Sequence, residues 1–80
     1  MTKSVFTNAY RTFLELLVQI RQEKNITQVQ LAHQLKKPQS YISKYESGER
    51  RLDLIETRDI LKKLDVSLID FSRQLESLLK

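Results

Sequence analysis

Pro38 is the residue that most constrains how this chain can fold, because it interrupts a stretch that otherwise has helical character throughout. The stretch covers residues 27–48, TQVQLAHQLKKPQSYISKYESG. A proline removes a backbone donor from a helix interior and clashes with the preceding turn, but it suits the first turn of a new helix. Thr27 followed by Gln30 has the pattern of a capping box, and Gly48 suits a left-handed helix end. The stretch therefore predicts two short helices joined by a tight turn.

The two predicted helices differ in their faces. In the first, an apolar stripe at helical spacing comes from Val29, Leu31, Ala32 and Leu35. In the second, at ~100° per residue, Tyr45 and Glu46 fall on the same half as the inward-facing Ile42. The opposite half has no carboxylate and carries Ser40, Ser43, Lys44 and Ser47, with Tyr41 on one flank and Gln39 on the other. Such a face can present donors and acceptors to base edges, and it would also suit an ordinary solvated helix.

The segment resembles the helix-turn-helix of the Cro/CI-type repressors, also called the XRE family. The resemblance extends from about residue 21 to residue 71 and rests on a motif over residues 28–47 and its tail, through Gln28, Ala32, Ile42, Glu46, Gly48 and Arg50. Lys36 stands where the family usually has a turn glycine, and Pro38 stands where a Ser or Thr cap is common. A lysine forced to positive φ at this turn costs on the order of 1 kcal/mol.

The resemblance implies an all-α, five-helix, lambda-repressor-like DNA-binding domain over residues 1–80, with the helix-turn-helix at helices 2 and 3. It implies sequence-specific binding of double-stranded DNA by a small transcriptional regulator, a repressor acting as a homodimer on a pseudo-palindromic operator. By the same resemblance, Arg21 forms a structural ion pair with Glu46, and the inward position of Glu46 supports this because an unpaired carboxylate there would be costly. Gln28 would bond a phosphate and brace Gln39.

The net charge of the chain is concentrated around this motif. Residues 21–51 hold seven cations and three anions, giving +4, and the remaining residues hold seven of each, giving zero. Clustered Lys and Arg are the electrostatic pattern expected of a phosphate-binding surface. This favours nucleic acid as the partner over a randomly solvated surface.

These patterns assign candidate DNA contacts. The residues expected to reach base edges in the major groove are Gln39, Ser40 and Lys44, with Ser43 and Tyr41 as secondary candidates. The residues expected to contact the DNA backbone are Gln28, Lys24, Lys37, Ser47, Arg50 and Arg51, together with Tyr41. Solvated loop charges are the alternative for the two arginines.

The sequence predicts one helix before the motif and two after it. The first, ending near Lys24, has a stripe of Phe6, Tyr10, Phe13, Leu17 and Ile20, broadened by Leu14, Leu16 and Val18, for core packing or for a partner. The next begins at a capping box of Asp53 and Glu56 and should face inward with Leu54, Thr57, Leu61 and Leu64, helped by Ile55 and Ile60. The last spans residues 67–80 from Ser67 and Asp70 and carries a stripe of Leu68, Phe71, Leu75, Leu78 and Leu79.

Leu75, Leu78 and Leu79 are the candidate dimer contacts, and packing back on the first helix is the competing explanation. Enzyme activity is not expected, since the only histidine is His33, cysteine is absent, and Gly48 is the single glycine. No metal or other cofactor is expected. The chain shows neither a signal-peptide pattern nor an apolar run of membrane-spanning length, so a cytoplasmic protein without a membrane partner is expected.

Two other kinds of function remain open at this stage. One is an antitoxin-like or restriction-modification-controller-like module, which would bind a protein partner and autoregulate its operon. The other is a helical adaptor that does not contact DNA.

Overall fold

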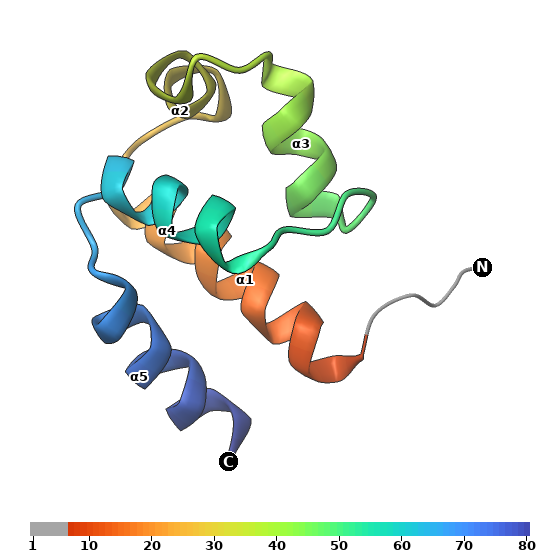
Figure 1. Ribbon diagram of the computed structural model, residues 1–80, viewed down its shortest axis with the longest axis vertical. Coiled ribbons are helices and arrows are strands. Elements are labelled where there is room, and N and C mark those ends of the chain that lie inside the picture. Colours follow the sequence, from red (N-terminus) through yellow and green to blue (C-terminus); the bar gives the residue numbers. More distant parts are fainter. Residues whose placement is uncertain (1–6) are drawn as a thin grey trace.

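The computed structural model describes residues 7–80, which form five α-helices and no strand (Figure 1). The helices are α1 (Asn8–Glu23), α2 (Gln28–Leu35), α3 (Gln39–Ser47), α4 (Leu54–Lys63) and α5 (Leu68–Leu79). The expected all-α, five-helix fold with a break at Pro38 is confirmed. Phe6, expected at the start of the first apolar stripe, lies outside the described residues.

Side-chain caps start four of the five helices. The hydroxyls of Thr7, Thr27 and Ser67 each accept a hydrogen bond from the N–H three residues on, at 3.0–3.1 Å. The carboxylate of Asp53 does the same at 2.7 Å, and both predicted capping boxes are complete. Pro38 lies at the N-cap of α3, in extended conformation, and not in the first turn where it was expected, and it makes no side-chain cap.

Left-handed residues follow four of the helices, and three of these residues are not glycine. Asn25, Lys36 and Asp65 have φ of 58°, 58° and 61°, and in each case the next N–H bonds to the carbonyl five residues back. This is the hydrogen-bonding pattern of a Schellman ending. Lys36 therefore takes the strained conformation expected of a lysine at a glycine position. Gly48, at φ 88°, ends α3 without that penalty.

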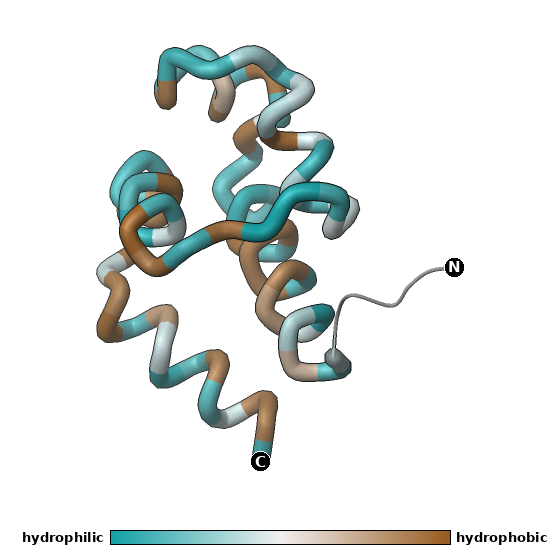
Figure 2. Tube along the Cα trace, turned by 45° about the vertical axis from the view of Figure 1, so that its right-hand side comes forward, coloured by the Kyte–Doolittle hydropathy of each residue, from teal (hydrophilic) through white to brown (hydrophobic). Residues whose placement is uncertain are grey.

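All five helices contribute to one core. Its completely buried side chains are Leu17, Leu31, Ile42, Tyr45, Ile60, Leu61, Leu64 and Phe71. α3 packs against both α1 and α2, α4 packs against α2, and α5 packs against α1. Figure 2 shows hydrophobic residues concentrated on the sides of the helices that face one another. α3 thus rests on two helices, which fixes its position and leaves its other side exposed.

Three apolar residues expected on inner helix faces are exposed instead. At 100° per residue, Ile55 lies ~165° and Val29 ~110° around its helix from the middle of the buried side, and the two side chains are 63% and 58% exposed. Leu54 lies nearer to the inner face of α4 but is 64% exposed, because it borders an open groove with Leu75 and Leu79 of α5. The expected inward positions of these three residues were wrong.

Candidate nucleic-acid interface

α3 divides into a buried and an exposed side. Ile42 and Tyr45 are buried in the core, and burial raises the pKa of the Tyr45 hydroxyl. The exposed residues include four of the candidate DNA contacts: Ser40, Ser43, Lys44 and Ser47. Gln39 is exposed at the start of the helix, and Tyr41 is half-buried on its flank. The face that could meet a polyanion is therefore open to solvent along the whole helix.

An ion pair between α1 and α3 holds this helix in place. Arg21 Nε lies 2.7 Å from Oε2 of Glu46, and Arg21 Nη2 donates to Oε1 at 3.1 Å. The third donor, Nη1, bonds the carbonyl of Ile26 at 2.8 Å. The two side chains are 10% and 8% exposed, so both charges are largely removed from water and each must be satisfied by its partner.

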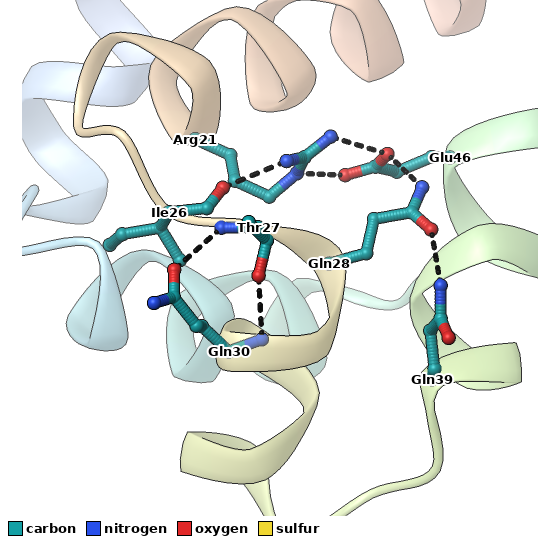
Figure 3. A network of polar contacts seen from close by, with 7 residues as sticks. All are labelled: Arg21, Ile26, Thr27, Gln28, Gln30, Gln39 and Glu46. Atoms are coloured by element: carbon teal, nitrogen blue, oxygen red, sulfur yellow. Dashed lines mark hydrogen bonds and ion pairs between the residues drawn. The ribbon is translucent and has the colours of Figure 1, made fainter.

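Two side-chain amides connect the Glu46 carboxylate to the exposed face of α3 through successive hydrogen bonds (Figure 3). Gln28 Nε2 donates to Oε1 of Glu46 at 2.8 Å. Gln39 Nε2 donates in turn to Oε1 of Gln28 at 3.3 Å. Gln28, the expected phosphate contact and brace for Gln39, therefore uses both ends of its amide inside the protein. The side chain at the outer end of this network is Gln39.

Two cations flank the ring of Tyr41. Lys37 Nζ lies 5.2 Å from the ring centroid and Arg50 Cζ lies 4.8 Å from it, while Tyr45 meets the ring edge-on with centroids 5.8 Å apart. Partial burial and then the charge of Glu56 raise the pKa of the Tyr41 hydroxyl, so this residue is a neutral donor at ordinary pH. Lys37, which precedes α3, and Arg50, which follows it, therefore both lie beside the Tyr41 ring on one flank of the helix.

Arg50 is also paired with a carboxylate. Its Nη2 lies 2.8 Å from Oε2 of Glu56, which belongs to the capping box of α4. The hydrogen bond from Arg50, followed by the one from the Asp53 backbone, lowers the pKa of Glu56. The pair is exposed, so Glu56 would compete with a DNA phosphate for this guanidinium.

Arg51 lies on a different ring from Arg50. Its Cζ is 4.1 Å from the ring centroid of Tyr10 in α1, and the Tyr10 hydroxyl accepts a hydrogen bond from the Leu52 N–H at 3.1 Å. Tyr10 therefore ties the loop after α3 to the first helix. The role of Tyr10 was missed from the sequence, where it appeared only as one member of an apolar stripe.

The other candidate residues lie at the surface or at its edge. Lys24 is exposed just after α1. Ser43 and Ser47 donate their hydroxyl protons to carbonyls three residues back, at 3.4 and 3.1 Å, and the Ser47 oxygen accepts from the Glu49 N–H at 3.5 Å. Leu75 is half-buried against the core, whereas Leu78 and Leu79 are 57% and 41% exposed.

The described residues 7–80 provide neither a metal-ligand cluster nor a membrane-length apolar helix. No three His, Asp or Glu side chains in this range come together in a way that could hold a metal ion. None of the helices there has both the length and the apolar character needed to cross a bilayer.

Comparison with known proteins adds two similarities to this geometry. The family model described as helix-turn-helix matches residues 17–71. The solved structure of an XRE-family like protein from Pseudomonas syringae pv. tomato str. DC3000 is similar, with a TM-score of 0.85 and 37% identity, over 91% of this chain and 89% of that one. None of the curated proteins matches the chain.

Proposed function

This chain belongs to the XRE family of DNA-binding helix-turn-helix regulators, and we propose that it is a small transcriptional repressor that binds a specific double-stranded operator as a homodimer. The observation that carries the proposal is the exposed side of α3. It bears hydroxyls, an amide and a lysine without a carboxylate, while Ile42 and Tyr45 anchor the opposite side in the core.

In the proposed complex, α3 lies in the major groove, which is wide enough to admit a helix. Its first turn carries Gln39 and Ser40, and the next carries Lys44, so these three side chains reach base edges. Ser43 and Tyr41 are secondary contacts at the sides of the helix. Amide, hydroxyl and ammonium groups offer the donors and acceptors by which base pairs are distinguished in this groove.

A second set of residues contacts the DNA backbone. Lys37 and Arg50 flank Tyr41 on one side of α3, and the net charge of +4 is confined to residues 21–51. Neutralising phosphates releases counterions, so these residues supply affinity that depends on salt and not on sequence. The full set of proposed backbone contacts is Gln28, Lys24, Lys37, Tyr41, Ser47, Arg50 and Arg51.

Dimerisation is proposed to use the end of α5. Leu78 and Leu79 are exposed there, and Leu75 lies at the inner edge of the same stripe, where it packs on the core. Two-fold symmetry would place two copies of α3 about one helical turn of DNA apart, roughly 34–36 Å. Sedimentation of Leu78→Glu/Leu79→Glu tests this contact, with Ile69→Glu as the matched control, because Ile69 is 66% exposed on another side of α5. A double variant that remains dimeric rules out the contact.

Two substitutions separate base reading from backbone binding. Gln39→Ala should weaken binding to the selected operator by about 1–3 kcal/mol and relax base preference, whereas Arg51→Ala should weaken all sequences alike and reduce the salt slope by about one. Gln34→Ala, an exposed change on α2, serves as the control. If Gln39→Ala weakens operator and random duplex equally, Gln39 is not a base reader. Absence of binding to random duplex even at low salt would refute the DNA-binding proposal as a whole.

A second candidate function is favoured by the apolar surface of α4. Leu54 and Ile55 are both exposed there, which suits an antitoxin-like or controller-like module that binds a protein partner and autoregulates its operon. In this alternative the same α3 face still binds DNA. Ile55→Ser would then lose the partner and retain operator binding, whereas in the repressor proposal it changes neither dimerisation nor DNA binding.

A further inference from the structure

We propose that the surface around Ile69, where α4 and α5 meet, binds an acidic segment of a partner protein in which a large apolar side chain lies between carboxylates. This Ile69 surface consists of two adjoining hollows that share Leu68 and Ile69. The inference goes beyond the proposed function, because the surface includes none of the proposed DNA contacts. The exposed residues Leu54 and Ile55 of α4 do not line it either.

The centre of the Ile69 surface is apolar. Ile69 is 66% exposed, and Leu68 and Val66 beside it are only partly buried against the core. At 100° per residue, Ile69 lies ~160° around α5 from the buried Phe71. α5 therefore cannot bury both side chains in the same core. A partner that covers Ile69 would remove its apolar area from water, which favours binding.

Cations border this apolar centre. Residues 52–80 contain five Lys and Arg and six Asp and Glu, which gives a net charge of −1. Four of the five cations line the two hollows, namely Arg58, Lys62, Arg73 and Lys80. Of the six anions, only Glu76 does so. A part of the chain that is slightly acidic as a whole thus presents a basic surface around Ile69, and carboxylates are the complementary groups.

The cations nearest to Ile69 have no partner among the described residues 7–80. The two ion pairs in this range use Arg21 and Arg50. No hydrogen bond, ion pair or ring contact there involves the charged group of Arg58, Lys62 or Arg73. These groups are therefore available to carboxylates of another molecule. Charges at the edge of an apolar contact select the partner and speed its approach more than they add affinity.

A protein segment suits this surface better than DNA does. Phosphates would satisfy the cations but would cover Ile69 with charge, whereas a peptide can supply both carboxylates and an apolar side chain. Figure 1 shows α5 and α3 on opposite sides of α1, so a duplex bound along α3 lies away from this surface. Arg58 belongs to the hollow on the α4 side of Ile69 and Arg73 to the other hollow. The expected segment therefore carries carboxylates on both sides of its apolar residue.

The experiment selects random peptides displayed on phage against the immobilised full chain. The enriched sequences should hold Leu, Ile, Phe or Trp between Asp or Glu residues. One such peptide is synthesised, and its dissociation constant is measured with the full chain and with variants. Ile69→Ser should weaken binding about tenfold or more, and Arg58→Glu about fivefold. Lys63→Glu is the matched control, because it makes the same charge change at an exposed position of α4 outside both hollows, and it should stay within about twofold.

Several results would overturn the inference. They are a selection that enriches no peptide, enriched peptides without carboxylates, binding that survives Ile69→Ser, and equal losses in Arg58→Glu and Lys63→Glu. Vesicles containing phosphatidylglycerol and a random DNA duplex are titrated with the same variants. If Arg58→Glu weakens binding to either of these more than Lys63→Glu does, the surface binds lipid or DNA and the inference is wrong.

The outcome for the proposed function is separate. Arg58→Glu and Lys63→Glu should have the same small effect on operator binding, since neither residue is a proposed DNA contact. Failure of the full chain to bind any duplex would refute the proposed function and leave peptide binding at Ile69 unaffected. Failure of the peptide experiments would refute the inference and leave DNA binding unaffected.

Discussion

Replacing Arg21 with Met should destabilise this domain far more than the loss of an exposed ion pair would. The guanidinium makes three hydrogen bonds, two to Glu46 at 2.7 and 3.1 Å and one to the carbonyl of Ile26 at 2.8 Å. Methionine retains most of the aliphatic stem, so little packing is lost. What remains is a carboxylate that is only 8% exposed and whose charge has lost its partner.

The expected size follows from that burial. Removing one member of a buried pair costs about 3–5 kcal/mol. For Arg21→Met we expect the lower limit of this range, because Glu46 keeps its hydrogen bond from Gln28 at 2.8 Å. A domain of this length has a total free energy of unfolding of about 4–12 kcal/mol. A loss of about 3 kcal/mol lowers the midpoint of thermal unfolding by roughly 12–24 °C.

Urea unfolding followed by circular dichroism measures this free energy. Arg58→Met removes an arginine from the exposed surface of α4 and is the control, with little expected effect. The double variant Arg21→Met/Glu46→Met should recover part of the loss, because it leaves no uncompensated charge in the protein. If Arg21→Met costs less than about 1 kcal/mol, as an exposed pair would, the pair does not stabilise the position of α3 as argued.

Further substitutions test the turn, the loop and the exposed pair. Lys36→Gly should raise the free energy of unfolding by about 1 kcal/mol by relieving a left-handed lysine, and an unchanged value would argue against strain at φ 58°. Tyr10→Phe should cost about 1–3 kcal/mol by leaving the Leu52 N–H unpaired, measured by urea unfolding. Glu56→Gln keeps a capping side chain but frees Arg50, so it should tighten binding to every duplex and steepen the salt dependence, measured by titration at several salt concentrations. Because the pKa of Glu56 is lowered in the folded chain, its pair with Arg50 stabilises the fold above the ordinary carboxyl pKa and loses that effect as the pH falls through the lowered value. The difference in thermal midpoint between the original chain and Glu56→Gln should therefore shrink on acidification.

The helix boundaries were predictable because they depend on local chemistry. Thr27, Asp53 and Ser67 bond N–H groups only three residues away, and Pro38 and Gly48 act on their own backbone. The division of α3 into a buried and an exposed side was predictable for a similar reason, since helical geometry alone determines it once one inward residue is known.

Contacts that depend on how the helices are packed could not be predicted in this way. Leu54 has the right spacing for the inner face of α4, but its exposure depends on whether the end of α5 closes over it. The Tyr10 ring meets Arg51 only because the loop after α3 passes the start of α1. Glu56 was read as a capping residue, and nothing in a capping pattern indicates that it also pairs with Arg50.

The polar network through Glu46 joins three helices. Arg21 donates to the carboxylate from α1 and pairs with its charge, while Gln28 donates to it from the start of α2 and accepts a hydrogen bond from Gln39. Arg21→Met should therefore lower stability more than Gln28→Met, because only the first leaves the Glu46 carboxylate without an opposite charge. Gln28→Met leaves the ion pair in place, so it should cost no more than one hydrogen bond to a charged group, about 1.5–3 kcal/mol. Urea unfolding of the two variants measures this difference, and an equal loss in both would contradict the importance given to the ion pair.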